Sequence, residues 1–278
     1  MENYYISETN HSKEYKKQCW DMAMGLQAVD DLKPSGYLRQ LADEHINGTL
    51  SNDEIEKLLY NKYENETLEE KLERNKESDL VANRIVKLLA EKAFSFSPVT
   101  LKHIHRTLFE GIYEHAGLFR QYNISKDEPV LNGATVIYAD FRTIEDTLRY
   151  DFLEEKEKKY STMSNEKVLD RISKFTSDIW QAHPFMEGNT RTTAVFMERY
   201  LNSLGFKVNN VYFAENSKYY RNALVRANYA EYGRGIDEDM SFLRQFYENL
   251  LYDGKMFYNL ATPSLQISPI VEILLRDD

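Results

Sequence analysis

The stretch "QAHPFMEGNTRTTAVF", residues 181–196, decides how this chain is interpreted. It overlaps the end of an apolar periodic segment, "KVLDRISKFTSDIWQAH", whose spacing predicts a helix. Pro184 cannot continue that helix in the ordinary way, so we expect the helix to end near His183. A Gly-Asn pair then allows a turn, and we expect Thr190 to cap a second helix that starts near Arg191. The stretch therefore predicts a helix, a polar loop and a second helix.

The loop carries side chains that suit phosphate chemistry. His183 has an ordinary pKa near neutrality and could deprotonate a hydroxyl. Glu187 supplies a hard oxygen of the kind that Mg2+ prefers. Gly188 and Asn189 lead into a helix N-terminus, where free backbone N–H groups bind anions, and Arg191 adds a planar, always-charged fork. Together these residues indicate a site for phosphoryl or nucleotidyl transfer.

Each of these residues also has a simpler explanation. A lone histidine at a helix end is more often structural than catalytic. His183 and Glu187 stand at i and i+4, as in half of a zinc site, but no H-E-x-x-H occurs in the chain. A Gly-Asn turn by itself carries no functional information. The combination within nine contiguous residues is what favours the functional interpretation.

The rest of the chain predicts an all-α fold with one short β-hairpin. Residues 1–65 read as three short helices, and Ser51 with Glu54 forms a capping box before the third. Further helical patterns recur from residue 80 to residue 252. Apolar residues flank Asn132 and Gly133 in "EPVLNGATVIYADF", which is a hairpin signal.

The strongly charged segment "ENETLEEKLERNKESD" separates two parts of the chain. A solvated helix face or a linker is its simplest explanation, and we take it as the boundary between a small module and the main domain. The predicted organisation is a helical module over residues 1–65, a connecting segment over 66–79, a main domain over 80–252 and a tail over 253–278.

Composition excludes several classes of protein. The chain has 278 residues and a net charge of -10, so DNA or RNA is disfavoured as the main partner. Cys19 is the single cysteine, which excludes an intramolecular disulfide and a cysteine metal cluster. The polar N-terminal stretch predicts no signal peptide, and no apolar run is long enough to span a bilayer. We therefore expect a cytoplasmic protein without a membrane partner.

The nonapeptide "HPFMEGNTR" resembles the Fic motif, HPFx(D/E)GN(G/K)RxxR, of enzymes that transfer AMP from ATP to protein hydroxyls. Two other segments fit this resemblance. "HAGLFR", residues 115–120, resembles the G-x-F-R segment upstream of the family's active site, and the predicted hairpin lies where the family carries its target-docking flap. The resemblance covers roughly residues 80–250, and the motif positions that match are His183, Pro184, Phe185, Glu187, Gly188, Asn189 and Arg191.

The resemblance implies a protein adenylyltransferase with a Fic-type helical bundle. MgATP would be the substrate, with Mg2+ as cofactor, and the acceptor would be a Ser, Thr or Tyr hydroxyl on a target protein or on this chain itself. His183 would be the catalytic base, Phe185 would anchor the loop in the core and Glu187 would be the Mg2+ ligand. The resemblance further implies phosphate-binding roles for the loop residues Gly188, Asn189, Thr190 and Arg191.

Two positions depart from the family pattern. Thr190 replaces Gly or Lys, and a β-branched residue there resists positive φ and narrows the anion-binding loop. Ala194 occupies the place of the family's second arginine, which holds the γ-phosphate and pairs with an inhibitory glutamate. The nucleotide that this site prefers is therefore left open by the sequence.

The first sixty residues resemble the small antitoxin proteins that inhibit Fic enzymes through an (S/T)xxxE(G/N) motif. The aligned stretch carries Leu26, Asp30 and Asp31 at the three defining positions, so the motif is degenerate. Because Ala194 cannot pair with an acid, we expect Asp30 to form no ion pair there and Asp30→Gly to change activity little. "SPIVE", residues 268–272, is a second, weaker candidate for an inhibitory element.

Two alternatives stay open beside AMP transfer. Without the second arginine, the enzyme could transfer another nucleoside monophosphate or a phosphate. A different class of protein, a nucleotide-binding toxin–antitoxin regulatory module with little catalysis, is favoured by the lost arginine and disfavoured by the retained His183. The sequence also leaves the target protein and the oligomeric state, a homo-oligomer included, undetermined.

Overall fold

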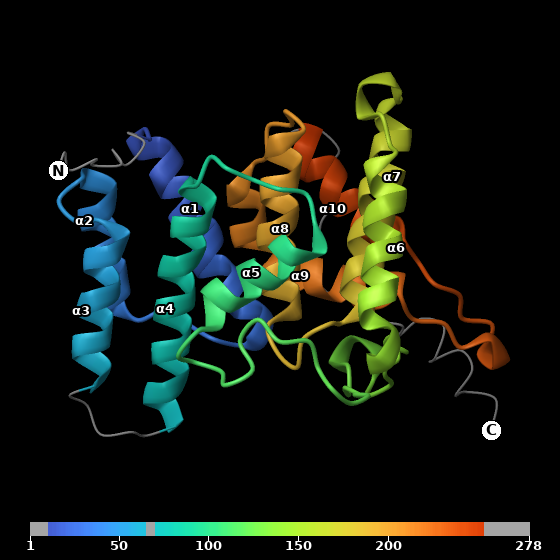
Figure 1. Ribbon diagram of the computed structural model, residues 1–278, viewed down its shortest axis with the longest axis horizontal. Coiled ribbons are helices and arrows are strands. Elements are labelled where there is room, and N and C mark those ends of the chain that lie inside the picture. The colour runs from blue at the N-terminus through green and yellow to red at the C-terminus, as the bar shows by residue number, and fades with distance from the viewer. Residues whose placement is uncertain (1–10, 65–69, 253–278) are drawn as a thin grey trace, which may run out of the picture.

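Ten α-helices build the part of the chain that the computed structural model describes, residues 11–64 and 70–252 (Figure 1). Their bounds are α1 Lys13–Gly25, α2 Gly36–Asn47, α3 Asn52–Glu64, α4 Glu70–Ala90, α5 Pro98–Phe109, α6 Ile144–Lys156, α7 Asn165–Ala182, α8 Asn189–Ser203, α9 Asn210–Ala227 and α10 Ser241–Tyr252. No strand occurs in these two ranges. The prediction of an all-α fold is confirmed for them.

The first three helices start where their capping residues predict. The side chain of Ser12 accepts a hydrogen bond from the backbone at the start of α1, and Ser35 does the same for α2. The capping box before α3 is also formed, because the Ser51 N–H donates to Glu54 Oε2 at 2.8 Å and Glu54 N–H donates to Ser51 Oγ at 3.3 Å. The three short helices predicted for residues 1–65 are therefore present.

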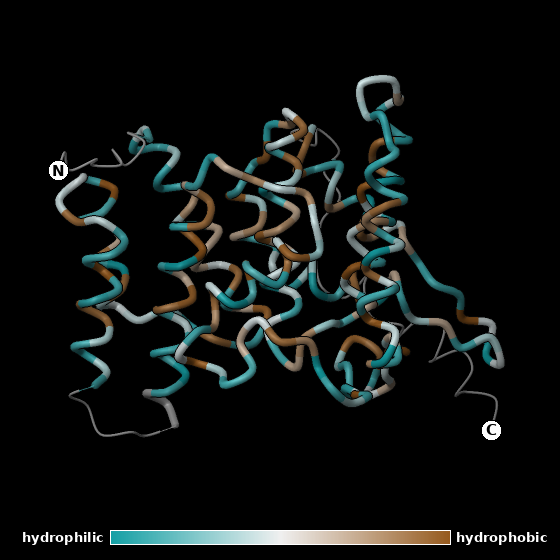
Figure 2. The backbone as a smooth tube through the Cα atoms, in the orientation of Figure 1, coloured by the Kyte–Doolittle hydropathy of each residue, from teal (hydrophilic) through white to brown (hydrophobic). Residues whose placement is uncertain are grey.

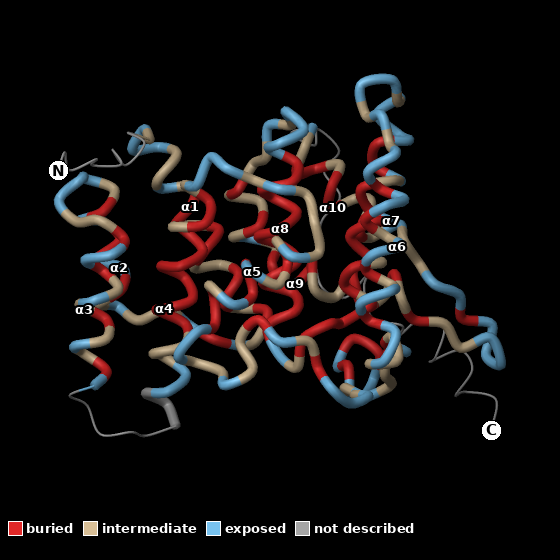
Figure 3. The backbone as a smooth tube through the Cα atoms, viewed as in Figure 1, coloured by how far each residue is buried: buried red, intermediate tan, exposed pale blue. Residues whose placement is uncertain are grey.

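Helix α8 lies at the centre of the fold. Every residue from Asn189 to Leu201 is buried, because α8 is packed against α4, α5 and α7. α2 and α3 lie side by side at one end of the molecule next to α4, and α6 and α7 lie side by side towards the other end (Figure 1). Figures 2 and 3 show the apolar and buried stretches where helices face one another, and exposed stretches at the outer turns.

The N-terminal helices share one hydrophobic core with the rest of the described chain. Trp20 and Met22 of α1 are buried in the same cluster as α8 and α9. α1 crosses α9 so closely that a Cβ atom on Gly25 would lie 2.4 Å from the Cα of Ala214. The backbone carbonyl of Gly25 also accepts a hydrogen bond from Ser217 Oγ at 2.8 Å. The apolar character of Trp20, Met22 and Met24 predicts such a shared core, and the structure buries Trp20 and Met22 in it and packs the partly buried Met24 against it.

The predicted β-hairpin around Asn132 and Gly133 is wrong. Both residues have positive φ, 53° and 91°, so the turn itself forms as expected. The residues before it, however, form a short 3-10 helix, η2 (Pro129–Leu131), and Glu128 is fully buried in an ion pair with Arg221. Because the segment is held by side-chain contacts rather than by a strand partner, it is a loop.

The structure tests the predicted organisation of the chain only in part. Helix α4 starts at Glu70 and runs through the predicted boundary between residues 79 and 80, so the charged connecting segment is largely part of that helix. The division into domains otherwise stays a prediction. The tail over 253–278, with the second candidate inhibitory element at Ser268–Glu272, lies outside the described residues. Across the described ranges, no helix combines the length and apolar character needed to cross a bilayer.

Candidate active site

The loop between α7 and α8 is set by two left-handed residues. His183 follows the last residue of α7 with φ 43° and ψ 58°, and its N–H donates to the carbonyl of Trp180. Gly188 has φ 74° and precedes α8 directly. A Cβ atom at Gly188 would lie 2.4 Å from the ring of Phe109, so only glycine fits there. The end of α7 near His183 was predicted correctly.

Asn189 and Thr190 hold the loop together through their side chains. The Phe185 N–H donates to Asn189 Oδ1 at 3.0 Å, and Asn189 Nδ2 donates to the Phe185 carbonyl at 2.8 Å. Thr190 Oγ1 accepts a hydrogen bond from Trp180 Nε1 at 3.0 Å. The expectation that Thr190 caps a helix starting near Arg191 is wrong, because α8 starts at Asn189 and Thr190 already has helical conformation.

His105 and Gly117, which lie outside the motif, support the motif loop. His105 of α5 stacks on Phe185 with ring centroids 3.8 Å apart. Gly117 N–H donates to His105 Nδ1 at 2.8 Å, so the opposite ring nitrogen carries the proton and donates to the Glu187 carbonyl at 3.1 Å. Burial lowers the pKa of His105 to about 3, which keeps this arrangement neutral. The expectation that Phe185 anchors the loop is confirmed.

Arg120 fixes the position of the His183 backbone. Arg120 Nε donates to the His183 carbonyl at 2.8 Å, and the Arg120 N–H donates to the Pro184 carbonyl at 2.8 Å. The side chain of Arg120 is buried, so these bonds form away from competing water. The upstream "HAGLFR" segment thus supplies a direct structural support for the loop, through its last residue.

The imidazole of His183 is enclosed by aromatic rings. It is 3% exposed, with the Tyr138 ring centroid 4.1 Å away and the Trp180 ring centroid 5.2 Å away. Neither ring nitrogen has a hydrogen-bond partner among the described residues. Burial, and then the nearby charge of Lys126, hold the pKa of His183 well below its usual value. His183 is therefore a neutral imidazole at physiological pH.

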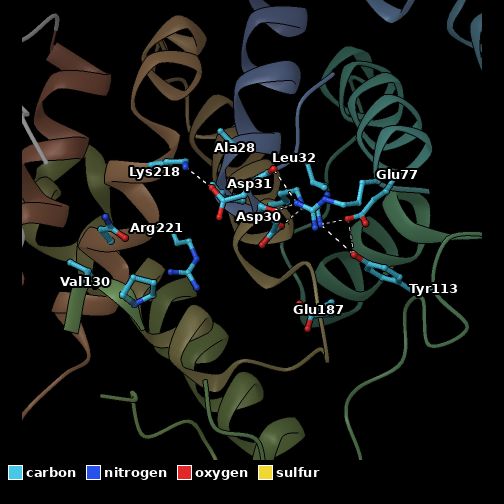
Figure 4. Close-up of a pocket in the computed structure, with 15 residues that line it drawn as sticks. Ala28, Asp30, Asp31, Leu32, Glu77, Tyr113, Val130, Glu187, Lys218 and Arg221 are labelled. Atoms are coloured by element: carbon cyan, nitrogen blue, oxygen red, sulfur yellow. Dashed lines mark hydrogen bonds and ion pairs between the residues drawn. The ribbon is translucent and has the colours of Figure 1, made fainter. Parts of the chain in front are cut away.

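A cavity of about 570 Å³ lies beside the motif loop (Figure 4). Figure 4 shows Glu77 and Tyr113 on one side of it and Lys218 and Arg221 on the other. Its volume falls within the roughly 300–1,000 Å³ typical of small-molecule sites. Its lining includes four basic residues, Arg74, Arg191, Lys218 and Arg221, and four acidic ones, Asp30, Asp31, Glu77 and Glu187.

Arg191 is engaged by carboxylates from two other elements. Its Nη2 donates to Glu77 Oε1 of α4 at 2.6 Å. Its Nε lies 2.8 Å from Asp30 Oδ2, at the end of the 3-10 helix η1 (Leu26–Asp30), although the N–H does not point at that oxygen. Burial opposes the charge of Arg191, but Asp30 and Glu77 outweigh it and raise the pKa of Arg191.

This contact corrects an expectation about Asp30. The sequence predicts that Asp30 forms no ion pair, because Ala194 stands where the family's second arginine would be. Ala194 is indeed buried and apolar, but Asp30 pairs with Arg191, the first arginine of the motif. Glu77 was not singled out by the sequence, since 114 residues separate it from Arg191.

Glu187 lies at the exposed edge of the cavity. Its carboxylate is 51% exposed and lies 3.2 Å from Lys126 Nζ. No group of three or more metal-type ligands occurs in the described part of the chain. Mg2+ in nucleotide sites commonly uses only one or two carboxylates and takes its other ligands from phosphates and water. The accessible carboxylate of Glu187, on the motif loop at the edge of the cavity, fits that pattern.

Helix α9 contributes two cavity residues that the sequence analysis missed, Lys218 and Arg221. None of the helical patterns singled out from the sequence lies over residues 210–227. The buried residues of α9 include Phe213, Tyr220 and Leu224, whose spacing of seven and four residues is a helical signal that could have identified this helix. The backbone of Asn216 is not helical, so α9 is kinked at this residue.

Comparisons with known proteins find a family similarity in the middle of the chain. Residues 95–201, which include the motif loop, match the model of the Fic/DOC family. Among solved structures, the N-terminal Fic domain of the Bep8 effector protein from Bartonella sp. 1-1C has a TM-score of 0.54 and 19% identity, covering 69% of this chain and 90% of that chain.

Two further solved structures share the fold. The N-terminal Fic domain of a VirB-translocated Bep effector from Bartonella quintana, which holds ADP, has a TM-score of 0.54 and 18% identity, over 67% of this chain and 87% of that chain. A Fic family protein from Desulfovibrio desulfuricans G20 has a TM-score of 0.51 and 12% identity, over 98% of this chain and 70% of that chain. At these identities the likeness concerns the fold.

Proposed function

We propose that the protein is an adenylyltransferase of the Fic type, because residues 95–201 match the Fic/DOC family model. It transfers AMP from MgATP to a Ser, Thr or Tyr hydroxyl on a target protein or on itself. The observation that carries this proposal is a buried, neutral His183 on the loop that leads into α8, whose Arg191 lines a cavity of nucleotide size.

His183 acts as the general base. An imidazole whose pKa lies well below neutrality is unprotonated and can accept a proton from an acceptor hydroxyl. As the hydroxyl oxygen bonds to the α-phosphorus, the bond from that phosphorus to its bridging oxygen breaks and pyrophosphate leaves. The proton passes from the hydroxyl to His183. Tyr138 covers His183 in the present conformation, so this loop residue must move aside for the acceptor to enter.

The start of α8 and Arg191 bind the phosphates. The first turn of α8 leaves backbone N–H groups without partners inside the helix, and these groups favour an anion. The Bartonella quintana domain with a similar fold holds ADP, which supports nucleotide binding by this fold. Asn189 and Thr190 serve this site through their backbone, because their side chains are engaged with Phe185 and Trp180.

Glu187 is the residue of this chain that would hold Mg2+. When bound, the ion would offset phosphate charge during the transfer. Lys126 now lies against the carboxylate of Glu187, and both side chains are partly exposed, so the contact is weak and easily exchanged.

The structure also favours a second state with little transfer. Asp30 and Glu77 occupy Arg191, so the arginine cannot bind phosphate until at least one carboxylate withdraws. We propose that the resting protein is self-inhibited by these two acids. Asp30 belongs to the N-terminal module, so this proposal keeps for that module an inhibitory role of the toxin–antitoxin type. The inhibition acts on Arg191, and not on the second arginine of the family motif.

Incubation with each of four nucleotides tests the proposed function. Purified full-length protein is mixed with Mg2+ and ATP, GTP, UTP or CTP, and its intact mass is measured with and without candidate acceptor proteins. A gain of one AMP from ATP supports adenylyl transfer. A gain in mass from GTP, UTP or CTP would mean that another nucleotide is the donor. If neither the wild type nor the Asp30→Asn/Glu77→Gln variant gains mass with any nucleotide, the proposal is contradicted.

A further inference from the structure

Helix α9 places a second arginine on the cavity opposite the motif loop. Arg221 lines the same cavity as Arg191, and Figure 4 shows its guanidinium on the other side from Glu77. Its side chain is 21% exposed, which leaves it accessible from the cavity but shielded from bulk water. Position 194, where the family pattern has an arginine, holds a buried alanine that can contact no phosphate.

Two hydrogen bonds to Glu128 orient the guanidinium of Arg221 and leave its other N–H donors for a ligand. Nη1 donates to Glu128 Oε2 at 2.7 Å and Nη2 donates to Glu128 Oε1 at 3.3 Å. A guanidinium has five N–H groups, and these two bonds account for two of them. Glu128 is fully buried and is held in turn by Tyr138, whose hydroxyl donates to Glu128 Oε1 at 3.2 Å. Glu128 thus fixes the fork, and three N–H groups remain for a ligand.

The other basic residues of the cavity are less suited to binding an anion. Arg191 is engaged by Asp30 and Glu77. Arg74 donates to the backbone carbonyls at the end of η1. Lys218 is 62% exposed, and its partner Asp31 is 78% exposed, so its charge is largely screened by water. Arg221 alone among the four combines partial burial with a fixed planar fork, the geometry that binds phosphate oxygens in pairs.

We propose that Arg221 binds the outer phosphates of the nucleoside triphosphate, in the place of the arginine missing at position 194. This inference rests on the proposed function, because it assigns a residue to the same nucleotide site. Arg221 reaches the site from α9, so the phosphate-binding arginines come from opposite sides of the cavity, with Arg191 on α8.

Binding measurements on full-length variants test this role. Affinities for ATP, AMP and inorganic tripolyphosphate are measured by calorimetry for the wild type, Arg221→Gln and Lys218→Gln. Loss of a phosphate-binding fork should weaken ATP and tripolyphosphate binding by roughly tenfold or more and leave AMP binding within about twofold. Lys218→Gln removes the same charge three residues away on α9, so it measures the general electrostatic effect, expected to be below about threefold.

A variant of Glu128 distinguishes a binding role of Arg221 from a structural role. Glu128→Gln removes the competing charge but can still accept a hydrogen bond, so ATP should bind as well as in the wild type or better. If Arg221 merely supports the loop, Glu128→Gln should weaken binding as much as Arg221→Gln does, and the inference is overturned. The double variant Glu128→Gln/Arg221→Gln leaves no buried unpaired carboxylate and should still lose triphosphate affinity, even if Arg221→Gln alone does not fold.

The remaining outcomes distinguish this inference from the proposed function. Binding of ATP and tripolyphosphate that depends on Arg221, without AMP transfer by any variant, would support the inference and contradict the transferase. AMP transfer with triphosphate affinity equal in the wild type and Arg221→Gln would contradict the inference alone. If the wild type binds neither ATP nor tripolyphosphate, both are overturned.

Discussion

His183 illustrates how a single backbone conformation determines the chemistry of a side chain. The left-handed φ of His183 turns the chain out of α7 just before Pro184, and Arg120 holds the His183 carbonyl in that position. The imidazole is thereby enclosed beside Tyr138, where burial favours its neutral form. The helix end could be read from Pro184, but the enclosure could not, because Tyr138 comes from a segment far away in the sequence.

The depressed pKa of His183 predicts a flat pH profile. Because the folded-state pKa lies well below 6.5, the base stays unprotonated as the pH falls from 8 to 6, and kcat/KM for transfer should change little. A base with an ordinary histidine pKa near 6.5 would lose about fourfold in activity over that range. Rates measured in buffers of constant ionic strength decide between the two, and a fourfold fall centred near pH 6.5 would contradict the buried, neutral base.

Glu187 predicts a specific change in magnesium dependence. Replacing it by alanine removes the one carboxylate of the motif loop, so the Mg2+ concentration for half-maximal activity should rise by roughly tenfold. Glu110→Ala is the matched control, because Glu110 is an exposed carboxylate paired with Arg106 outside this cavity. Identical magnesium titrations for Glu187→Ala and the wild type would place the metal ligand elsewhere.

Two elements meet at Arg191 in a contact that no sequence pattern indicates. η1 brings Asp30, and α4 brings Glu77, from positions more than a hundred residues away in the chain. Asp30 of the degenerate motif lines the cavity beside the motif loop. The expectation that Asp30 forms no ion pair was wrong, because the family pattern directs attention to position 194, whereas Asp30 pairs with Arg191.

The contact at Arg191 predicts activation when the acids are neutralised. Asp30→Asn and Glu77→Gln should each increase the rate of transfer, and the double variant should increase it by roughly tenfold or more, since a charge-assisted hydrogen bond contributes about 1.5–3 kcal/mol. Glu73→Gln is the control, because Glu73 lies one turn earlier on α4 and is exposed. Transfer rates at equal concentrations of folded protein provide the test, and equal rates in the double variant and wild type would exclude self-inhibition by these acids.

The loop around Asn132 shows why the local sequence pattern did not predict the secondary structure of this segment correctly. Asn132 and Gly133 adopt the positive φ values that their residue types favour. The flanking residues do not pair as strands, because Glu128 is drawn into the interior by Arg221 of α9. A hairpin needs two partners in register, and this long-range ion pair is invisible in the segment itself.

The whole molecule depends on α1 for its core. The close approach of Gly25 to Ala214 joins α1 to α9, and Trp20 is buried with its Nε1–H bonded to His45 Nδ1 at 3.0 Å. Hydrophobic periodicity predicted most of the helices, α9 excepted, but it could not show that α1 packs directly against α9.

This shared core predicts that the N-terminal module cannot be removed cleanly. Deletion of residues 1–65 should give insoluble protein, because it exposes the apolar surface that α1 covers. Trp20→Ala should lower the free energy of unfolding by about 3–5 kcal/mol, whereas Leu153→Ala, at a residue 59% exposed, should change it by less than about 0.5 kcal/mol. Urea unfolding measures both values, and a soluble, stable truncation would mean that the module folds apart from the main domain.

The central claim is that this chain transfers the AMP part of ATP and that His183 is the base. Full-length wild type, Asp30→Asn/Glu77→Gln and the same double variant carrying His183→Ala are incubated with ATP labelled at the α- or the γ-phosphate. We expect the protein to gain label from α-labelled ATP alone, more in the double variant than in the wild type, and we expect His183→Ala to abolish the gain while ATP still binds. Label from γ-labelled ATP, or undiminished labelling with His183→Ala, would contradict the central claim.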